Sequence, residues 1–72
     1  MIREDIVNNV QELRLKANET QESLARAVDV SRQTIIAVEK GNYVPSVLLA
    51  LKIARFFKKS VEEVFKIESH AK

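Results

Sequence analysis

Three consecutive side chains that can form hydrogen bonds to nucleotide bases follow Ser31. Arg32 can bind guanine through two hydrogen bonds or reach a phosphate, Gln33 can pair with adenine, and Thr34 can contact either base. Bases are read in this way when a helix enters the major groove with its N-terminus first. The ordinary alternative is the solvated polar face of a small helix. For these three residues alone the two interpretations have about equal weight.

Two apolar residues of the same segment extend this set. Ile36 and Ala37 could contact the methyl group of a thymine. Ile36 lies off the helical stripe formed by Ile35 and Val38, so it is either simply exposed or used at an interface. Because single exposed apolar residues are common on protein surfaces, Ile36 favours an interface only slightly.

Residues 20–41 predict two short helices joined by a tight turn, which would hold these side chains. Thr20 and Ser31 are N-cap residue types directly before helix-forming runs, and Gly41 suits a left-handed C-cap. The spacing gives each helix one apolar face, formed by Leu24, Ala25 and Val28 in the first and by Ile35 and Val38 in the second. A helix, a short turn and a second helix make the supersecondary unit that reads DNA.

A second group of side chains could hold the phosphate backbone. Gln21 lies in the first turn of the first helix, where free backbone N–H groups favour an anion. Lys40, Asn42 and Tyr43 follow the second helix and could grip the backbone on that side. The alternatives are an ordinary first-turn glutamine and a tyrosine ring that packs against the next helix.

Glu39 occupies an unusual position for an acid. It follows Ile35 by four residues, so it points along the stripe that faces the core. A buried carboxylate without a partner costs several kcal/mol. Arg14, at the apolar edge of an earlier helix, is the candidate partner. The sequence therefore predicts an Arg14–Glu39 ion pair that fixes the orientation of the second helix.

The rest of the chain predicts three further helices and no strand, so the expected fold class is all-α, with one domain of five short helices. The first helix is expected over residues 5–17, capped by Asp5, with an apolar stripe of Ile6, Val10, Leu13 and Ala17. The fourth is expected over residues 47–58 after Ser46, with a buried face of Ala50, Leu51, Ala54 and Phe57. Ser60 and Glu63 form a capping box that opens the short fifth helix. Residues 1–4 are expected to be a loose start and residues 68–72, with His70, a frayed tail.

Length and composition limit the functional classes. Seventy-two residues make one small domain, expected to have its core at about 5–67, and a net charge of +2 permits a nucleic-acid partner without requiring one. The absence of cysteine excludes disulfides and cysteine-bound zinc. No apolar run approaches the ~20 residues that cross a membrane, so the expected location is the cytoplasm with no membrane partner. No catalytic triad, glycine-rich phosphate loop or metal-ligand cluster is present, so we expect no enzyme, no cofactor and no metal.

The joint pattern of residues 10–65 resembles the phage repressor and Cro-type helix-turn-helix proteins. More narrowly, it is similar to the small stand-alone regulators of the xenobiotic-response-element family. The motifs that carry this resemblance are Thr20-Gln21, Leu24-Ala25, Val30-Ser31-Arg32-Gln33-Thr34-Ile35, Glu39-Lys40-Gly41, Pro45-Ser46 and Leu51-Lys52-Ile53-Ala54. Two residues depart from the family pattern: Asp29 stands where glycine is usual, and Glu19 stands where an apolar or basic residue is more usual.

The resemblance implies a repressor-like DNA-binding domain of five helices. It also implies sequence-specific binding to double-stranded DNA by a transcriptional regulator, taken here as a repressor, that works as a dimer. It assigns base contacts to Arg32, Gln33, Thr34 and Ala37, with Ile36 as an additional candidate. It assigns phosphate contacts to Gln21, Ser31 and residues 40–43, and it also supports the Arg14–Glu39 pair.

The remaining apolar residues suggest how two copies could associate. Phe56, Phe65 and Ile67 are the expected dimer surface, unless they complete the core of the monomer. A different class of function stays open, because the same fold can serve as a protein-interaction module such as an antitoxin or a transcription bridging factor. In that case the second helix need not read bases.

Overall fold

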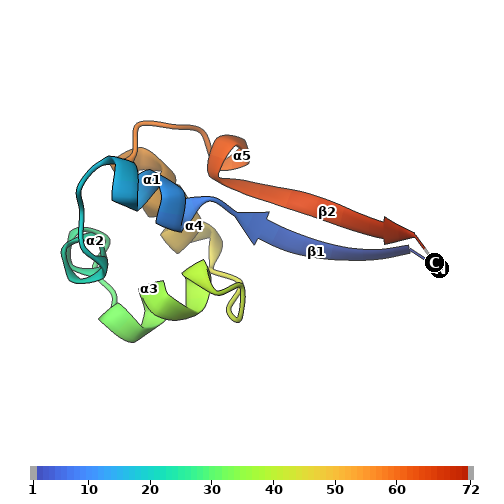
Figure 1. The fold of residues 1–72 in the computed structure, drawn as a ribbon, viewed down its shortest axis with the longest axis horizontal. Helices are drawn as coiled ribbons and strands as arrows, with labels where there is room; N and C mark the ends of the chain where they lie inside the picture. Colours follow the sequence, from blue (N-terminus) through green and yellow to red (C-terminus); the bar gives the residue numbers. More distant parts are fainter. Residues whose placement is uncertain (1, 72) are drawn as a thin grey trace.

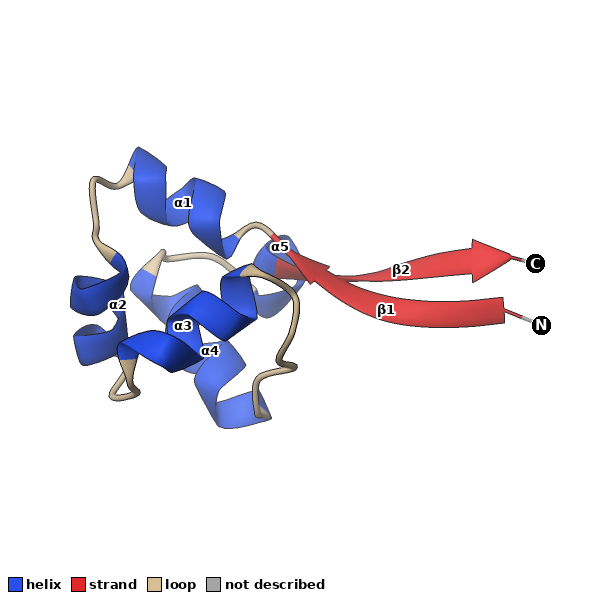
Figure 2. Cartoon of the chain, turned by 60° about the horizontal axis from the view of Figure 1, so that its bottom comes forward, coloured by secondary structure: helices blue, strands red, loops and turns tan. Residues whose placement is uncertain are grey.

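The computed structural model describes residues 2–71 and combines a helical body with a two-stranded ribbon (Figure 1). The elements follow in the order β1 (Ile2–Asn8), α1 (Val10–Lys16), α2 (Gln21–Ala27), α3 (Arg32–Glu39), α4 (Val47–Phe56), α5 (Val61–Val64) and β2 (Phe65–Ala71). The ribbon leaves the body beside α5, and α2 lies on the opposite side of the body (Figure 2). The two strands bring the first and last parts of the chain side by side.

Ten buried apolar side chains from all five helices and their ends form the core of the body. These are Val10, Leu24, Ala25, Val28, Ile35, Val38, Leu49, Ile53, Ala54 and Val64. The two apolar faces predicted for α2 and α3 are therefore confirmed. None of the helices within residues 2–71 has the length and apolar composition needed to span a bilayer.

The all-α prediction is wrong for the N-terminal segment. The helix expected to begin at Asp5 starts only at Val10, and Ile2–Asn8 forms β1 instead. Asn8 Oδ1 accepts the backbone N–H of Val10 at 3.0 Å, and the N–H of Asn9 binds the carbonyl oxygen of Val64 at 3.1 Å. The chain before Val10 therefore satisfies its backbone groups through β2 and α5 rather than through another helical turn.

The prediction of a frayed tail is also wrong for residues 68–71, because they belong to β2. β2 runs antiparallel to β1 over its whole length, with Ile6 paired with Ile67 and Arg3 paired with His70. His70 Nε2 lies 3.4 Å from Asp5 Oδ2 and 3.3 Å from Glu68 Oε1, so it faces two carboxylates across and along the ribbon. The parts of these predictions that concern Met1 and Lys72 lie outside the described residues.

Each of the helices α1 to α4 is closed by a residue with a left-handed backbone. These residues are Asn18, Asp29, Gly41 and Lys58, with φ between 57° and 78°. After each of them, the next backbone N–H returns to a carbonyl in the last turn, which is the Schellman arrangement. Asn, Asp and Gly are the residue types that adopt this conformation most readily, so the first three ends could be expected from the sequence.

The buried face of α4 differs from the predicted one. Leu49, Ile53 and Ala54 are buried, whereas Leu51, which was expected to be buried, is 52% exposed. α4 carries apolar residues on all sides, so periodicity alone does not determine which face meets the core.

The short helix α5 begins as predicted. Ser60 Oγ accepts the N–H of Glu63 at 3.3 Å, and Glu63 Oε1 accepts the N–H of Ser60 at 2.8 Å. This backbone hydrogen bond holds the pKa of Glu63 below its ordinary value of 4.5.

Candidate nucleic-acid interface

The two helices of the helix-turn-helix unit begin at the predicted cap residues. Thr20 Oγ1 accepts the N–H of Ser23 at 2.9 Å, and Ser23 Oγ accepts the N–H of Thr20 at 3.0 Å. Ser31 Oγ accepts the N–H of Thr34 at 3.2 Å. Each cap satisfies backbone donors that would otherwise have no partner, so the starts of α2 and α3 are fixed locally.

The turn between α2 and α3 is formed around Asp29 and Val30. Asp29 adopts a φ of 62°, and the N–H of Val30 bonds to the carbonyl oxygen of Ala25 at 2.9 Å. Val30 is half-buried and packs against the core. The turn therefore forms in the left-handed conformation although an aspartate stands in place of the usual glycine.

The start of α3 is open to solvent while its opposite face is anchored. Ile35 and Val38 have no exposed surface, whereas Arg32 and Gln33 are exposed at the N-terminal end of the helix. Figure 2 shows α3 on the outside of the body. This arrangement holds the helix firmly and leaves its first polar side chains available to a ligand.

Three further residues proposed for base contacts are less accessible. Thr34, Ile36 and Ala37 are half-buried. Thr34 Oγ1 lies 3.0 Å from Ser31 Oγ, so these two hydroxyl groups share a hydrogen bond. Thr34 also lies beside Tyr43 along a shallow depression of about 330 Å³ between the turn and the start of α4.

A buried network joins α1, α2 and α3. Arg14 Nε donates to Glu39 Oε2 at 2.7 Å, and Arg14 also donates to the carbonyl oxygen of Glu19 at 2.9 Å. The side chains of Arg14 and Glu39 are only 9% and 3% exposed. The structure thus contains the ion pair that the sequence predicts, and this pair connects the last turn of α3 to α1.

Gln21 belongs to the same network. Its amide nitrogen donates to Glu39 Oε1 at 3.1 Å, which leaves one amide hydrogen and the amide oxygen for other partners. Gln21 and Arg32 also line one open, polar depression of about 680 Å³ beside Arg14 and Thr20. The start of α2 and the start of α3 are therefore neighbours on the surface.

The residues proposed to hold the backbone on the far side lie after α3. Lys40, Asn42 and Tyr43 are all exposed. The N–H of Asn42 returns to the carbonyl oxygen of Ala37 at 2.9 Å, and Gly41 has a φ of 78°. This turn places the three side chains at the opposite end of α3 from Arg32.

The three residues expected at a dimer surface have different environments. Phe56 and Phe65 are half-buried and pack against the core, and the rings of Phe56 and Phe57 meet edge to face at 5.0 Å. Ile67 is 69% exposed on the ribbon. Of the three, only Ile67 is mostly free of the body of its own chain.

Asn8 has a positional role that sequence reasoning missed. Its amide nitrogen donates to the carbonyl oxygen of Val38 at 2.9 Å, and its oxygen caps Val10. The end of β1 is thereby attached to the last turn of α3. No local pattern marks this asparagine, because its partner lies thirty residues away.

Comparison with known proteins agrees with this geometry. A helix-turn-helix family model matches residues 10–64, the span from the start of α1 to the end of α5. The chain belongs to the helix-turn-helix family of transcriptional regulators. It is 52% identical over 61 residues to the uncharacterized HTH-type transcriptional regulator YgzD of Bacillus subtilis. The aligned residues are 85% of this chain and 92% of that protein.

Relatives of this helix-turn-helix protein also occur in archaea. An HTH-type regulator of Methanocaldococcus jannaschii is 53% identical over 58 residues, which are 81% of this chain and 88% of the relative. One from Archaeoglobus fulgidus is 52% identical over 56 residues, 78% of this chain and 79% of the relative. The family is one of DNA-binding regulators and not of enzymes. Within the part of the chain that the structure describes, no group of three or more acidic or histidine side chains is placed to hold a metal ion.

Proposed function

We propose that this protein is a sequence-specific transcriptional repressor of the cytoplasm, acting as one domain that inserts α3 into the major groove of double-stranded DNA. The observation that carries the proposal is the contrast across α3. Arg32 and Gln33 are exposed at the start of the helix, while Ile35 and Val38 behind them are fully buried. A rigidly held helix with free hydrogen-bonding side chains at its N-terminus is what direct readout of bases requires.

The individual roles follow from position and accessibility. Arg32 and Gln33 read base edges, and Thr34, Ile36 and Ala37 add closer contacts as α3 enters the groove. The phosphate contacts come from Gln21 and Ser31 on one side and from Lys40, Asn42 and Tyr43 on the other. Because Gln21 is hydrogen-bonded to Glu39, the network with Arg14 orients this phosphate contact.

The proposed function is tested by selecting bound duplexes from a random pool with the purified protein. We expect enrichment of a short motif present as two half-sites. The half-sites should lie about 34 Å apart, one turn of the DNA, because each of two copies would place α3 in one of two successive major grooves. We also expect the logarithm of the affinity to fall linearly with the logarithm of the salt concentration, by about 0.9 for each phosphate contact. If no duplex is enriched above the starting pool, the protein is not a sequence-specific regulator.

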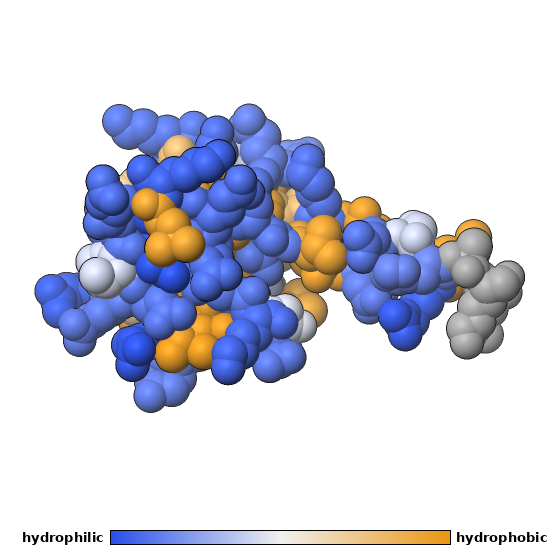
Figure 3. Space-filling view, viewed as in Figure 1, coloured by the Kyte–Doolittle hydropathy of each residue, from blue (hydrophilic) through white to orange (hydrophobic). Residues whose placement is uncertain are grey.

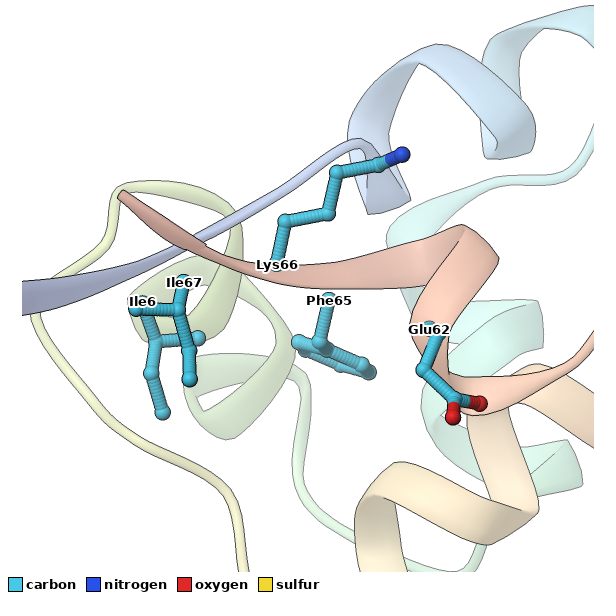
Figure 4. A pocket seen from close by; sticks show the side chains of 5 residues that line it. All are labelled: Ile6, Glu62, Phe65, Lys66 and Ile67. Atoms are coloured by element: carbon cyan, nitrogen blue, oxygen red, sulfur yellow. The ribbon is translucent and has the colours of Figure 1, made fainter. Parts of the chain in front are cut away.

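Two half-sites require two copies of this chain. One module of this kind buries only ~600–1,000 Å² against DNA, so a homodimer would add the affinity that one copy lacks. We propose that the copies meet around Phe56, Phe65 and Ile67. In support, Ile6, Phe65 and Ile67 line an open apolar depression of about 410 Å³ where the ribbon leaves the body. Figure 4 shows these three side chains on one side of the ribbon and Lys66 pointing to the other.

Replacing Ile67 by aspartate should shift the dimer toward the monomer in sedimentation velocity, because a carboxylate would be buried in an apolar contact. Val7→Asp is the matched control, since it adds the same charge to the opposite face of the ribbon, where Val7 pairs with Lys66. We expect the control to sediment like the wild type. A wild-type protein that stays monomeric at high concentration would refute the dimer.

A further inference from the structure

We propose that the outer side of α4 binds an acidic, amphipathic helix of a partner protein. The surface in question, called the α4 groove, runs along α4 to the start of α5 and has a volume of about 540 Å³. Its floor is apolar and its rim is basic. The floor consists of Leu48, Leu51, Ala54 and Val61, and the rim of Lys52, Arg55 and Lys59.

The floor of the α4 groove is unusually exposed for large apolar side chains. Leu48 is 63% exposed and Leu51 is 52% exposed. Val44 and Val47, which precede them in the chain, are also exposed. The first turns of α4 extend beyond α3 at the bottom of the body (Figure 2). Apolar side chains that gather in this way, with polar side chains around them, are typical of protein interaction sites.

Other apolar surface is visible on the molecule, so the α4 groove is distinguished by its charge. Figure 3 shows apolar side chains at the base of the ribbon as well as on the helical body. Residues 41–60, however, contain Lys52, Arg55, Lys58 and Lys59 and no acidic residue at all. The rest of the chain holds eight basic residues against ten acidic ones, so this segment supplies the net positive charge of the protein.

The charge of the rim selects the chemistry of the occupant. Opposite charges around an apolar contact favour association and exclude wrong partners, whereas like charges placed against each other are unfavourable. A second copy of this chain would bring the same basic rim against itself across a two-fold axis. An acidic partner would pair with Lys52, Arg55 and Lys59 instead.

A nucleic acid fits the α4 groove less well than an acidic protein does. Phosphates would satisfy the rim but would leave Leu48 and Leu51 without apolar contacts. An amphipathic helix with leucines at positions i, i+3, i+4 and i+7 and glutamates beside them satisfies both parts. The residues that line the α4 groove all come from outside α3.

This inference goes beyond the proposed function and does not depend on it. A protein that binds no DNA could still use the α4 groove as an interaction module. A regulator that binds DNA through α3 would gain a second surface through which another protein recruits or restrains it.

The test uses the full chain and two fluorescein-labelled helical peptides of about fifteen residues. Both carry leucine at i, i+3, i+4 and i+7; one has glutamate at the flanking positions and the other has lysine. By fluorescence anisotropy we expect the glutamate peptide to bind at least ~10-fold more tightly than the lysine peptide. Its affinity should fall as salt screens the rim charges.

Two variants identify the site. Leu51→Asp and Arg55→Glu should each lower the affinity for the glutamate peptide at least ~10-fold. Both residues are exposed, so circular dichroism should show the wild-type helix content. Arg55→Glu should in addition gain affinity for the lysine peptide. Val7→Asp, on the ribbon, should leave peptide binding unchanged.

Several results would overturn the inference. They are equal binding of the two peptides, equal binding of a glutamate peptide with scrambled leucine positions, and no binding of the glutamate peptide at about 1 mM. The inference would also fail if the wild type forms a dimer and Leu51→Asp dissociates it, because the occupant of the α4 groove would then be a second copy. Failure of duplex selection would leave these outcomes unchanged, so the two proposals fail separately.

Discussion

Replacing Arg32 by alanine should weaken binding to the selected duplex by about 1–3 kcal/mol, which is roughly 5- to 150-fold in affinity. The reason is that Arg32 is exposed at the start of α3 and is free to form two hydrogen bonds to one guanine. The loss should be confined to that base pair. Duplexes selected with the variant should keep the wild-type preference elsewhere and become indifferent at one position of each half-site.

The control for this prediction is Arg26→Ala, which removes the same side chain from the last turn of α2. It should leave the selected motif unchanged. A different outcome for Arg32→Ala is also informative. If the variant lowers the affinity for all duplexes equally, and the salt dependence of binding falls by about one phosphate contact, Arg32 contacts the DNA backbone. If it changes neither affinity nor preference, α3 does not read DNA through its first residues.

Local signals were sufficient to predict where most helices begin. Thr20, Ser31, Ser46 and Ser60 each accept a backbone N–H from three residues further on, as their type and position suggested. The caps are interactions within a single turn, so no tertiary structure is needed to locate them. The exposure of Arg32 and Gln33 follows in the same way, because a helix that buries Ile35 and Val38 presents its other side to solvent.

The ribbon could not be recognised from local signals. Its strands pair residues 2–8 with residues 65–71, so almost the whole chain lies between the partners. Phe65, Lys66, Ile67 and Glu68 do alternate between apolar and polar, but four residues also fit the end of a helix. In β1, Ile6 and Val7 are adjacent and interrupt the alternation. Only the pairing itself shows that these two segments are strands.

The face of α4 was missed for a different reason. Eight of its ten residues, all except Lys52 and Arg55, are apolar, so several faces satisfy the helical spacing equally well. Packing against α5 and the rest of the core selects Leu49, Ile53 and Ala54. The consequence for function is direct, since Leu48 and Leu51 become the floor of the α4 groove.

Replacing Glu39 by alanine should lower the free energy of unfolding by about 3–5 kcal/mol. Arg14 would keep its positive charge in a site where only 9% of the side chain is exposed, with the carbonyl oxygen of Glu19 as its remaining partner. At roughly 0.05–0.15 kcal/mol per residue, a chain of 72 residues has about 4–11 kcal/mol of total stability, and it loses about 4–8 °C in Tm for each kcal/mol. The melting temperature measured by circular dichroism should therefore fall by tens of degrees.

The double variant Arg14→Met, Glu39→Leu separates the cost of an unpaired charge from the value of the pair. Apolar side chains of similar volume often replace a buried ion pair without loss of stability. We therefore expect the double variant to melt well above Glu39→Ala and near the wild type. Its DNA affinity should still be lower, because Gln21 loses the carboxylate that holds its amide nitrogen at 3.1 Å.

This combination distinguishes an orienting role from a stabilising one. Affinity is compared at a temperature where every variant is folded, so that unfolding does not contribute. A double variant with wild-type stability and weakened DNA binding supports the view that the network positions α2 against α3 for contact with the backbone. If Glu39→Ala leaves both the melting temperature and the DNA affinity unchanged, the ion pair has neither role. If the double variant binds DNA like the wild type, the pair stabilises the fold without orienting the surface that contacts DNA.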